Sequence, residues 1–178
     1  MLAKLFEVKE TGGRGKGLFA KQFIPKGTIV WVEDDNPDNA KVLTAEDLGY
    51  DKMSEKEKLE LFDYAYRREN GTFIAFSDDT KYLNHSCNAS ILGAELGFDI
   101  VVRDIEEGEE ATYDYRDFYD EVEMTCLCGE ENCCKILKFI HPVPEELKQF
   151  WKEKTDFALK LVNDVEQPLK EELKQTNN

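Results

Sequence analysis

The chain has 178 residues, an apolar content of 41% and a formal net charge of −15. This length predicts one domain, or one domain with a short extension, that is large enough to bury a core. The acidic balance argues against an electrostatic grip on nucleic acid and predicts attraction to basic partners, although the same charge can serve solubility alone. No apolar run approaches a membrane span, and the N-terminal residues lack the apolar region of a secretory signal. We therefore expect an intracellular protein with no membrane contact and no direct nucleic-acid binding.

The first third of the chain predicts short strands separated by turns. Residues 2–10 and 27–35 are rich in β-prone side chains, and glycine-containing turns lie at 12–17 and 24–27. Glycines in the segment GGRGKG would let backbone groups approach an anion or nucleotide, but the spacing is not that of a P-loop or of a dinucleotide-binding turn. Taken alone, this segment predicts a tight turn.

A helical stretch is expected next, from Thr44 to about Arg68. Thr44 and Ser54 are each followed three residues later by an acidic side chain, which is the pattern of a helix cap. Apolar residues at i, i+3 and i+7 predict one buried face. They are Leu59, Phe62 and Tyr66.

Strand patterns return at 72–78, 90–98, 99–105 and 111–115. A cysteine cluster follows, and after it a proline-initiated amphipathic helix is expected from Glu145 to about Val165, ending in a polar tail. The face that contains Phe150, Trp151 and Phe157 could pack on its own domain or form a homodimer, and packing on its own domain is favoured because an amphipathic face normally belongs to a core. The pattern as a whole predicts a mainly β fold with a helical insertion and a helical C-terminal extension.

Four of the five cysteines fall within CLCGEENCC, at 126–134. Clustered cysteines without a secretory signal are more often metal ligands than disulfides. Cys126, Cys128 and Cys133 supply three thiolates, and a structural zinc site needs four ligands. Adjacent residues rarely reach one metal together, so Cys87 is the natural fourth ligand and Cys134 is spare. The alternatives are free buried thiols or a redox pair.

Two further segments carry side chains with useful chemistry. YLNHSC, at 82–87, places His85 two residues before Cys87, but a thiolate bound to zinc cannot attack a substrate. A serine hydrolase is disfavoured because no G-x-S-x-G elbow is present. In ATYDY, Tyr113 and Tyr115 would share one face of a strand, where hydroxyls could orient an amine and rings could form an apolar channel. The same pattern also occurs in ordinary sheet faces.

The order of these segments is more informative than any one of them. GKGLFA, IPKG, YLNHSC, GEEATYDY and CLCGEENC follow one another as in SET-domain protein lysine methyltransferases with a post-SET zinc loop, and the chain resembles that family from about residue 4 to 137. The resemblance implies a mainly β (α+β) β-clip fold in which NHSC and TYDY cross as a pseudoknot. It implies a SET domain at 1–122 with a helical insertion at about 38–70, a post-SET zinc loop at 123–139 and a C-terminal helical extension at 140–178.

The resemblance also implies roles for individual residues. The positions that match S-adenosylmethionine contacts are Gly15, Lys16, Gly17, Asn84, His85 and Tyr115. The positions that match zinc ligands are Cys87, Cys126, Cys128 and Cys133. Tyr115 also matches the active-site tyrosine, and Tyr113 matches the position where Tyr or Phe tunes the number of methyl groups added.

These roles imply a lysine N-methyltransferase that acts on a basic protein, with a histone tail as the expected substrate. Lysine has a reference pKa of about 10.4, so an apolar tyrosine-lined channel would help by favouring the neutral amine. The hydroxyl of Tyr113 predicts mono- or dimethylation, and a eukaryotic source would imply a nuclear or chromatin location. The alternative is a non-catalytic SET-like module that binds a peptide or partner.

Overall fold

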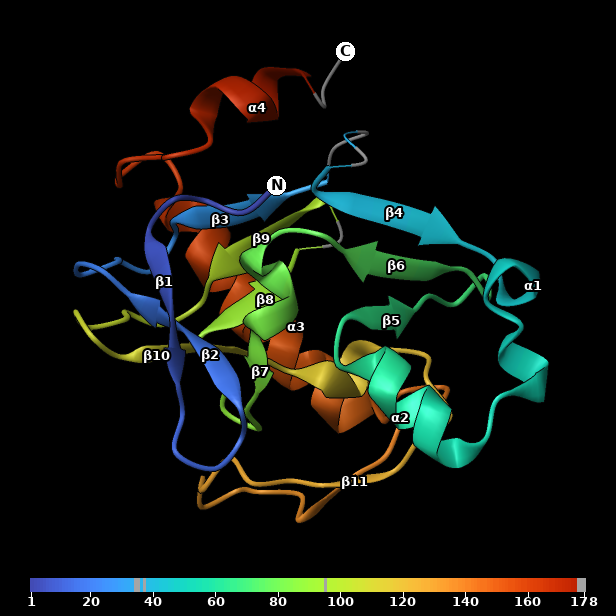
Figure 1. Cartoon of the computed structure of the whole chain (residues 1–178). Helices are drawn as coiled ribbons and strands as arrows, with labels where there is room; N and C mark the ends of the chain where they lie inside the picture. The colour runs from blue at the N-terminus through green and yellow to red at the C-terminus, as the bar shows by residue number, and fades with distance from the viewer. Residues whose placement is uncertain (34–35, 37, 95, 176–178) are drawn as a thin grey trace.

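The structure, a computed structural model, describes residues 1–33, 36, 38–94 and 96–175 (Figure 1). The last residues of the predicted strand 27–35 and of the predicted polar tail, together with residue 95 of the predicted strand 90–98, lie outside the described residues. Within the described ranges, no helix combines the length and the apolar character needed to cross a membrane.

Seven strands form the main sheet, in the order β1-β2-β10-β8-β9-β3, with β7 paired to β10. Their bounds are β1 Phe6–Glu10, β2 Lys16–Ala20, β3 Ile29–Val32, β7 Asn84–His85, β8 Ile91–Gly93, β9 Phe98–Val101 and β10 Glu110–Tyr113. The glycine segment is only in part the tight turn that its sequence predicts, because β2 begins within it at Lys16. Gly12 and Gly15 adopt positive φ in the β1–β2 turn, a conformation that glycine adopts without a steric cost.

The insertion contains both short helices and a small sheet. Its sheet has the order β4-β6-β5, and its helices lie at the far side from β1 (Figure 1). The bounds are β4 Ala40–Leu43, α1 Ala45–Leu48, η1 Tyr50–Lys52, α2 Glu55–Phe62, β5 Ala65–Arg67 and β6 Phe73–Phe76. The capping boxes predicted at Thr44 and Ser54 are both confirmed.

The predicted continuous helix 44–68 is wrong. Gly49, in the left-handed conformation at φ 64°, ends α1, and the chain after α2 pairs with β6 as β5 instead of continuing the helix. The predicted apolar face is therefore broken. Phe62 is buried, but Leu59 is exposed and Tyr66 lies on β5.

The C-terminal region contains one long helix that packs on the main sheet. The remaining elements are η2 Asp79–Tyr82, η3 Tyr115–Asp117, β11 Met124–Thr125, β12 Ile136–Leu137, α3 Glu145–Leu161 and α4 Lys170–Gln175. Helix α3 ends four residues before the predicted Val165 and contacts β8 and β9. Ala158 is fully buried and Trp151 packs against the core, whereas Phe157 is 52% exposed. The helix thus packs on its own domain, as favoured from the sequence.

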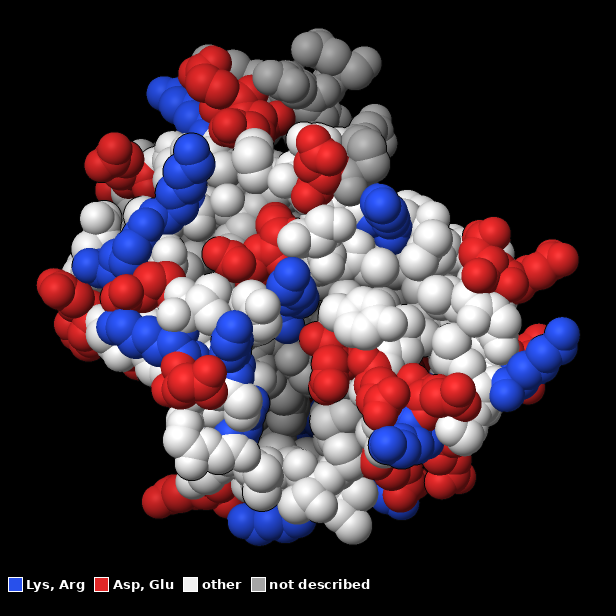
Figure 2. Space-filling view, viewed as in Figure 1, with Lys and Arg blue, Asp and Glu red and all other residues white. Residues whose placement is uncertain are grey.

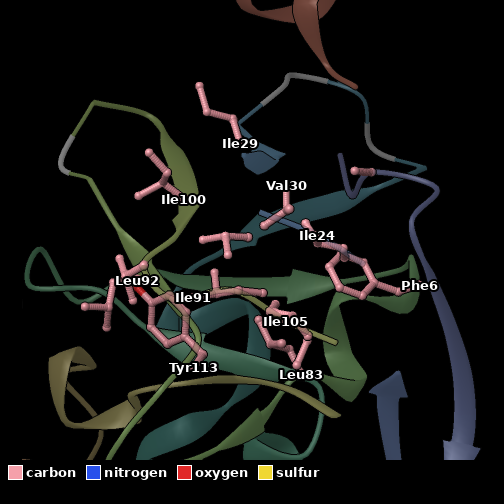
Figure 3. Close-up of a cluster of buried hydrophobic side chains, with 14 of the residues drawn as sticks. Phe6, Ile24, Ile29, Val30, Leu83, Ile91, Leu92, Ile100, Ile105 and Tyr113 are labelled. Carbon is pink, nitrogen blue, oxygen red and sulfur yellow. The ribbon is translucent and has the colours of Figure 1, made fainter. Parts of the chain in front are cut away.

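One apolar cluster connects the main sheet and α3, and Figure 3 shows Tyr113 among its side chains. Its most buried members come from strands and turns spread along the chain. They include Leu18, Ile24, Val30, Ile91, Ile100, Ile105 and Ala158. This core confirms the mainly β fold with a C-terminal helix.

The segments NHSC and TYDY lie side by side through parallel pairing of β7 with β10. Asn84 is in register with Thr112 and His85 with Tyr113. The backbone N–H of Ser86 donates to the Tyr113 carbonyl at 2.9 Å. The predicted meeting of these two segments is confirmed, and it brings the candidate site residues together.

Candidate active site and thiol cluster

Tyr113 and Tyr115 line one cavity between the main sheet and the insertion. Strand β10 ends at Tyr113 and η3 begins at Tyr115, so the two rings do not share a strand face as the sequence predicts. They nevertheless reach the same space, whose walls are mainly aromatic. The aromatic lining is Trp31, Phe62, Tyr64, Tyr66, Phe76, Tyr113, Tyr115 and Phe118.

The Tyr113 ring is held on two sides. It stacks on Phe118 with 5.5 Å between ring centroids, and its hydroxyl oxygen accepts a hydrogen bond from the Gly93 N–H at 3.2 Å. A Cβ atom at Gly93 would lie only 2.8 Å from that oxygen, so glycine is what allows the close approach. Burial, with the nearby carboxylates of Asp99 and Asp117, raises the pKa of Tyr113 well above its usual value. Its hydroxyl therefore stays protonated at neutral pH.

Tyr115 is anchored through both its backbone and its side chain. Its hydroxyl donates to the Leu83 carbonyl at 2.5 Å, and its N–H donates to Nδ1 of His85 at 3.1 Å. Phe62 packs against the ring at 5.4 Å between centroids. Burial, with a smaller contribution from Asp63, raises the pKa of Tyr115 above its usual value. The cavity thus presents two neutral phenols.

The glycine segment lies beside Asn84. The Asn84 side-chain amide donates to the Lys16 carbonyl and to Oε1 of Glu110, both at 2.8 Å. A Cβ at Gly17 would lie 2.6 Å from that carboxylate oxygen, so only glycine fits there without rearrangement. Arg14 closes the network with an ion pair to Glu110 and a hydrogen bond from Nη1 to the His85 carbonyl. The roles of Arg14 and Glu110 could not be predicted from the sequence, because they depend on contacts between distant strands.

His85 lies at the junction between the cavity and the cysteines. Its Nδ1 accepts from the Tyr115 N–H, while Nε2 lies 3.4 Å from Sγ of Cys87. Burial lowers the pKa of His85 to about 4, which keeps the imidazole neutral. Of the expected cofactor-binding residues, Asn84 and His85 are adjacent on β7, and Tyr115 contacts His85. Lys16 and Gly17 lie beside Asn84, and Gly15 lies in the β1–β2 turn.

The cysteine-rich loop is the turn of the β11–β12 hairpin. Sγ atoms of Cys87, Cys126, Cys128 and Cys133 all lie within 4.8 Å of one another. The Cys87 and Cys126 sulfurs are 3.9 Å apart. Tetrahedral zinc with Zn–S bonds of about 2.3 Å needs sulfurs about 3.8 Å apart, so these four thiols suit zinc.

Cys134 is not simply spare. A second group of donor atoms, from His85, Cys87, Cys126 and Cys134, meets the same 4.8 Å limit. In the four-cysteine group, two sulfur atoms accept hydrogen bonds from backbone N–H groups. Sγ of Cys87 accepts from Cys134 at 3.3 Å, and Sγ of Cys133 accepts from Lys135 at 3.4 Å. Backbone N–H groups aimed at sulfur favour the thiolate form that a metal requires.

A buried carboxylate fixes the centre of the TYDY segment. Asp114 is 1% exposed and accepts hydrogen bonds from Nε of Arg116 at 2.8 Å and Nε1 of Trp151 at 2.9 Å. Arg116 also donates from Nη2 to the Cys87 carbonyl at 3.3 Å. Trp151 thus connects α3 to the segment between the two tyrosines. Its place on an amphipathic face was visible in the sequence, but its hydrogen-bond partner was not.

Residues 15–116, more than half of the chain, match the family described as the SET domain, and the chain therefore belongs to that family. The matched range ends before Cys126, so the cysteine-rich loop lies outside it.

Relatives and a solved structure agree with this assignment. The chain is 37% identical over 83 residues to human histone-lysine N-methyltransferase SETD1B, which covers 39% of this chain and 4% of that protein. It is 40% identical over 86 residues to the H3 lysine-4 specific histone-lysine N-methyltransferase of Candida albicans, covering 39% of this chain and 8% of that protein. The methyltransferase domain of human SETMAR superposes with a TM-score of 0.52 at 22% identity, over 75% of this chain and 58% of that chain, which shows a shared fold. The chain spans only a small part of the curated relatives.

Proposed function

We propose that this chain is a protein lysine N-methyltransferase that uses S-adenosylmethionine and acts on a basic protein, with a histone tail as substrate. One observation carries the proposal. Two neutral tyrosines face an aromatic cavity directly beside the β7–β10 pairing, where Asn84 and His85 lie. Membership of the SET-domain family and the names of the relatives support the same activity.

The aromatic cavity suits a lysine side chain. Its walls can pack along the aliphatic stem, and a poorly hydrated site favours the neutral amine over the ammonium ion. The hydroxyl of Tyr115 is fixed by Leu83, so it can orient the amine nitrogen without reorganising. Orientation of this kind supplies much of the acceleration in a displacement reaction.

The glycine segment and the neighbouring NHSC segment suit the cofactor. S-adenosylmethionine, when bound, would supply a methyl carbon attached to a positively charged sulfur; this carbon is the electrophile, and the sulfur would keep the electron pair of the carbon–sulfur bond. We assign its binding to the backbone at Gly15, Lys16 and Gly17 and to Asn84, His85 and Tyr115. The hydrogen bond from Asn84 to the Lys16 carbonyl would keep the two cofactor-binding segments together.

We assign zinc to Cys87, Cys126, Cys128 and Cys133, as a structural ion of a post-SET loop at 123–139. The ion would attach this loop to the SET domain, assigned to 1–122, through Cys87. The side-chain amide of Asn132 already donates to the Cys87 carbonyl at 3.1 Å, which supports that docking.

The number of methyl groups follows from Tyr113. Its hydroxyl occupies space and can hold an amine N–H or a water molecule, so we propose mono- or dimethylation. The net charge of −15 and the acidic side chains over α2, which Figure 2 shows, suit a tail rich in Lys and Arg. A histone substrate would imply a nuclear or chromatin location. The absence of nucleic-acid binding and a homodimer through the C-terminal helix stay predictions.

The test is methyl transfer from labelled S-adenosylmethionine to a panel of histones and other basic proteins. We expect label on lysine. Tyr115→Phe removes only the orienting hydroxyl and should lower the rate of methyl transfer by about 10²- to 10⁴-fold. Tyr119→Phe is the matched control, because Tyr119 stacks on His141 outside the aromatic cavity. Cofactor binding without transfer to any protein would point to a different substrate. Neither binding nor transfer would contradict the proposal and favour the non-catalytic module.

A further inference from the structure

Two carboxyl groups, of Asp63 and Asp99, line the aromatic cavity together with Lys81, and the proposed reaction uses none of them. Asp99 lies on β9, paired with Gly93 of β8 on one side and Trp31 of β3 on the other. It lines the same cavity as Tyr113 and Tyr115. A Cβ built at Gly93 would lie 2.8 Å from the Tyr113 hydroxyl and 3.5 Å from Oδ1 of Asp99, so both oxygens border one small space.

A second polar group lines this cavity without a partner. Thr80 is 6% exposed, and its hydroxyl has no hydrogen-bond partner among the residues that the structure describes. It too belongs to the cavity lining. A buried hydroxyl that gives up water without a new hydrogen bond costs stability, so a partner that arrives with a ligand would remove that cost.

No cationic side chain of the described residues is paired with Asp99, although Lys81 lines the same cavity. The charged groups that act on it are Asp117 and Glu33, which repel the carboxylate, and the α-amino group of Met1, which attracts it. Burial, reinforced by these two acids, raises the pKa of Asp99 to about 7. A cation that enters the cavity would therefore strongly stabilise the ionised form of Asp99.

We propose that Asp99, together with the Thr80 hydroxyl, forms a polar subsite that receives the ammonium group of the substrate lysine. This inference rests on the proposed function and adds a specificity residue to it. A lysine side chain is charged in solution, and a carboxylate in a poorly hydrated, aromatic cavity attracts that charge more strongly than water-exposed acids do. The subsite therefore selects a primary ammonium as the side chain enters, and the amine loses its proton before the methyl-transfer step, which uses the neutral form.

The direct test uses butylammonium, a mimic of the lysine side chain, and does not require methyl transfer. The carboxyl carbon of Asp99 in the full chain is followed by NMR from pH 5 to pH 9, with and without the probe. We expect a titration midpoint near neutral pH that falls when butylammonium saturates the cavity. Neutral 1-butanol should leave the midpoint unchanged. An equal midpoint with and without butylammonium would overturn the inference.

Kinetics with a lysine peptide that the wild type methylates supply the second test. Asp99→Asn should raise KM for the peptide by about tenfold or more, with kcat changed far less, because the variant removes one partner of a buried charge pair. Thr80→Val should raise KM in the same direction by a smaller factor. The control Glu107→Gln makes the same change in charge at an exposed turn and should leave KM unchanged.

The outcomes separate the inference from the proposed function. A wild type that neither binds S-adenosylmethionine nor transfers a methyl group contradicts the function, while the butylammonium titration still decides the subsite. An active wild type with equal KM in Asp99→Asn and Glu107→Gln contradicts the subsite alone. A KM that rises equally in both acid variants would assign the effect to net charge and would also overturn the subsite.

Discussion

The aromatic cavity and the cysteine-rich loop are held in place by different forces. Tyr113 and Tyr115 are positioned by strand pairing, ring stacking and hydrogen bonds to backbone groups. The loop has only two-residue strands at its base, where Leu137 is buried, but its apolar residues Leu127 and Ile136 are 61% and 51% exposed. Apolar burial therefore accounts for the order of the cavity but not for that of the loop. We therefore expect the cavity to be preformed by the chain and the loop to need a metal bound to its thiols.

Cys87 is the point at which the two regions meet. It is fully buried, two residues after His85, and its carbonyl accepts hydrogen bonds from Arg116 and Asn132. A disturbance of the thiol cluster should therefore reach the cavity through the NHSC segment. The following changes test how independent the two regions are.

The largest effect is expected in the loop. Cys128→Ser should weaken zinc binding by more than about 100-fold, since even changes to groups outside a ligand shell cost roughly 10- to 100-fold. Cys134→Ser should keep one zinc ion per chain, because Cys134 belongs only to the second donor group. Metal content by mass spectrometry and competition with a chelator would measure both. If Cys128→Ser kept the zinc ion and Cys134→Ser lost it, the ion would instead be assigned to the donor group that contains His85.

A smaller effect is expected from the charge in the cavity. Asp99 has a pKa of about 7 in the folded protein against 3.8 for the free side chain, so folding binds a proton, and ionisation of Asp99 opposes folding increasingly as the pH rises from about 4 to 7. Between pH 5 and 8 the free energy of unfolding of the wild type should fall by about 3 kcal/mol relative to Asp99→Asn. Denaturant unfolding of both proteins across that range measures the difference. Parallel pH profiles would mean that Asp99 is solvated like a surface acid.

The attachment of α3 to the cavity is tested by Trp151→Phe. The change keeps an aromatic ring but removes the hydrogen bond from Nε1 to the buried Asp114. We expect a loss of about 1.5 kcal/mol in the free energy of unfolding, in the range for hydrogen bonds to charged groups. Tyr64→Phe, at an exposed side chain, serves as a control. Equal stability of the two variants would show that α3 contributes packing only.

The smallest change is expected for Tyr113→Phe. The ring and its stacking on Phe118 are kept, while the hydroxyl that accepts from Gly93 is removed. We expect total transfer to change by less than about tenfold and the products to shift toward higher methylation, because the freed space admits a bulkier amine. Mass spectrometry of the product peptide resolves the methylation states. Trimethyl-lysine as the main product of the unaltered enzyme would contradict the assigned role.

Much of the architecture could be predicted from the sequence because its motifs are local. The two tyrosines, the NHSC segment and the cysteine spacing are each read from a few neighbouring residues. The order of the motifs then indicates that distant segments meet, and the pairing of Asn84 with Thr112 bears this out. The inclusion of Cys87 in the four-cysteine site follows from counting zinc ligands, since three nearby thiols leave one coordination position to fill.

The rest depends on partners that the sequence does not name. Residues 65–67 follow a helical spacing, yet they form β5 because β6 offers an open edge for hydrogen bonding. Asp99 looks like an ordinary polar residue of an alternating strand, and only the cavity between the sheet and the insertion gives it a function. The partner of Trp151, Asp114, lies 37 residues away and was not identified for that reason.

Strand β10 has a consequence for biosynthesis. It pairs with β2, β7 and β8, so it joins a strand near the start of the chain to two strands that shortly precede it. The main sheet cannot close on the ribosome until residue 113 has left the exit tunnel, and contacts at such long sequence separation form slowly. We therefore expect nascent chains that stop before β10 to remain protease-sensitive and to depend on chaperones, however well their first hairpin has formed.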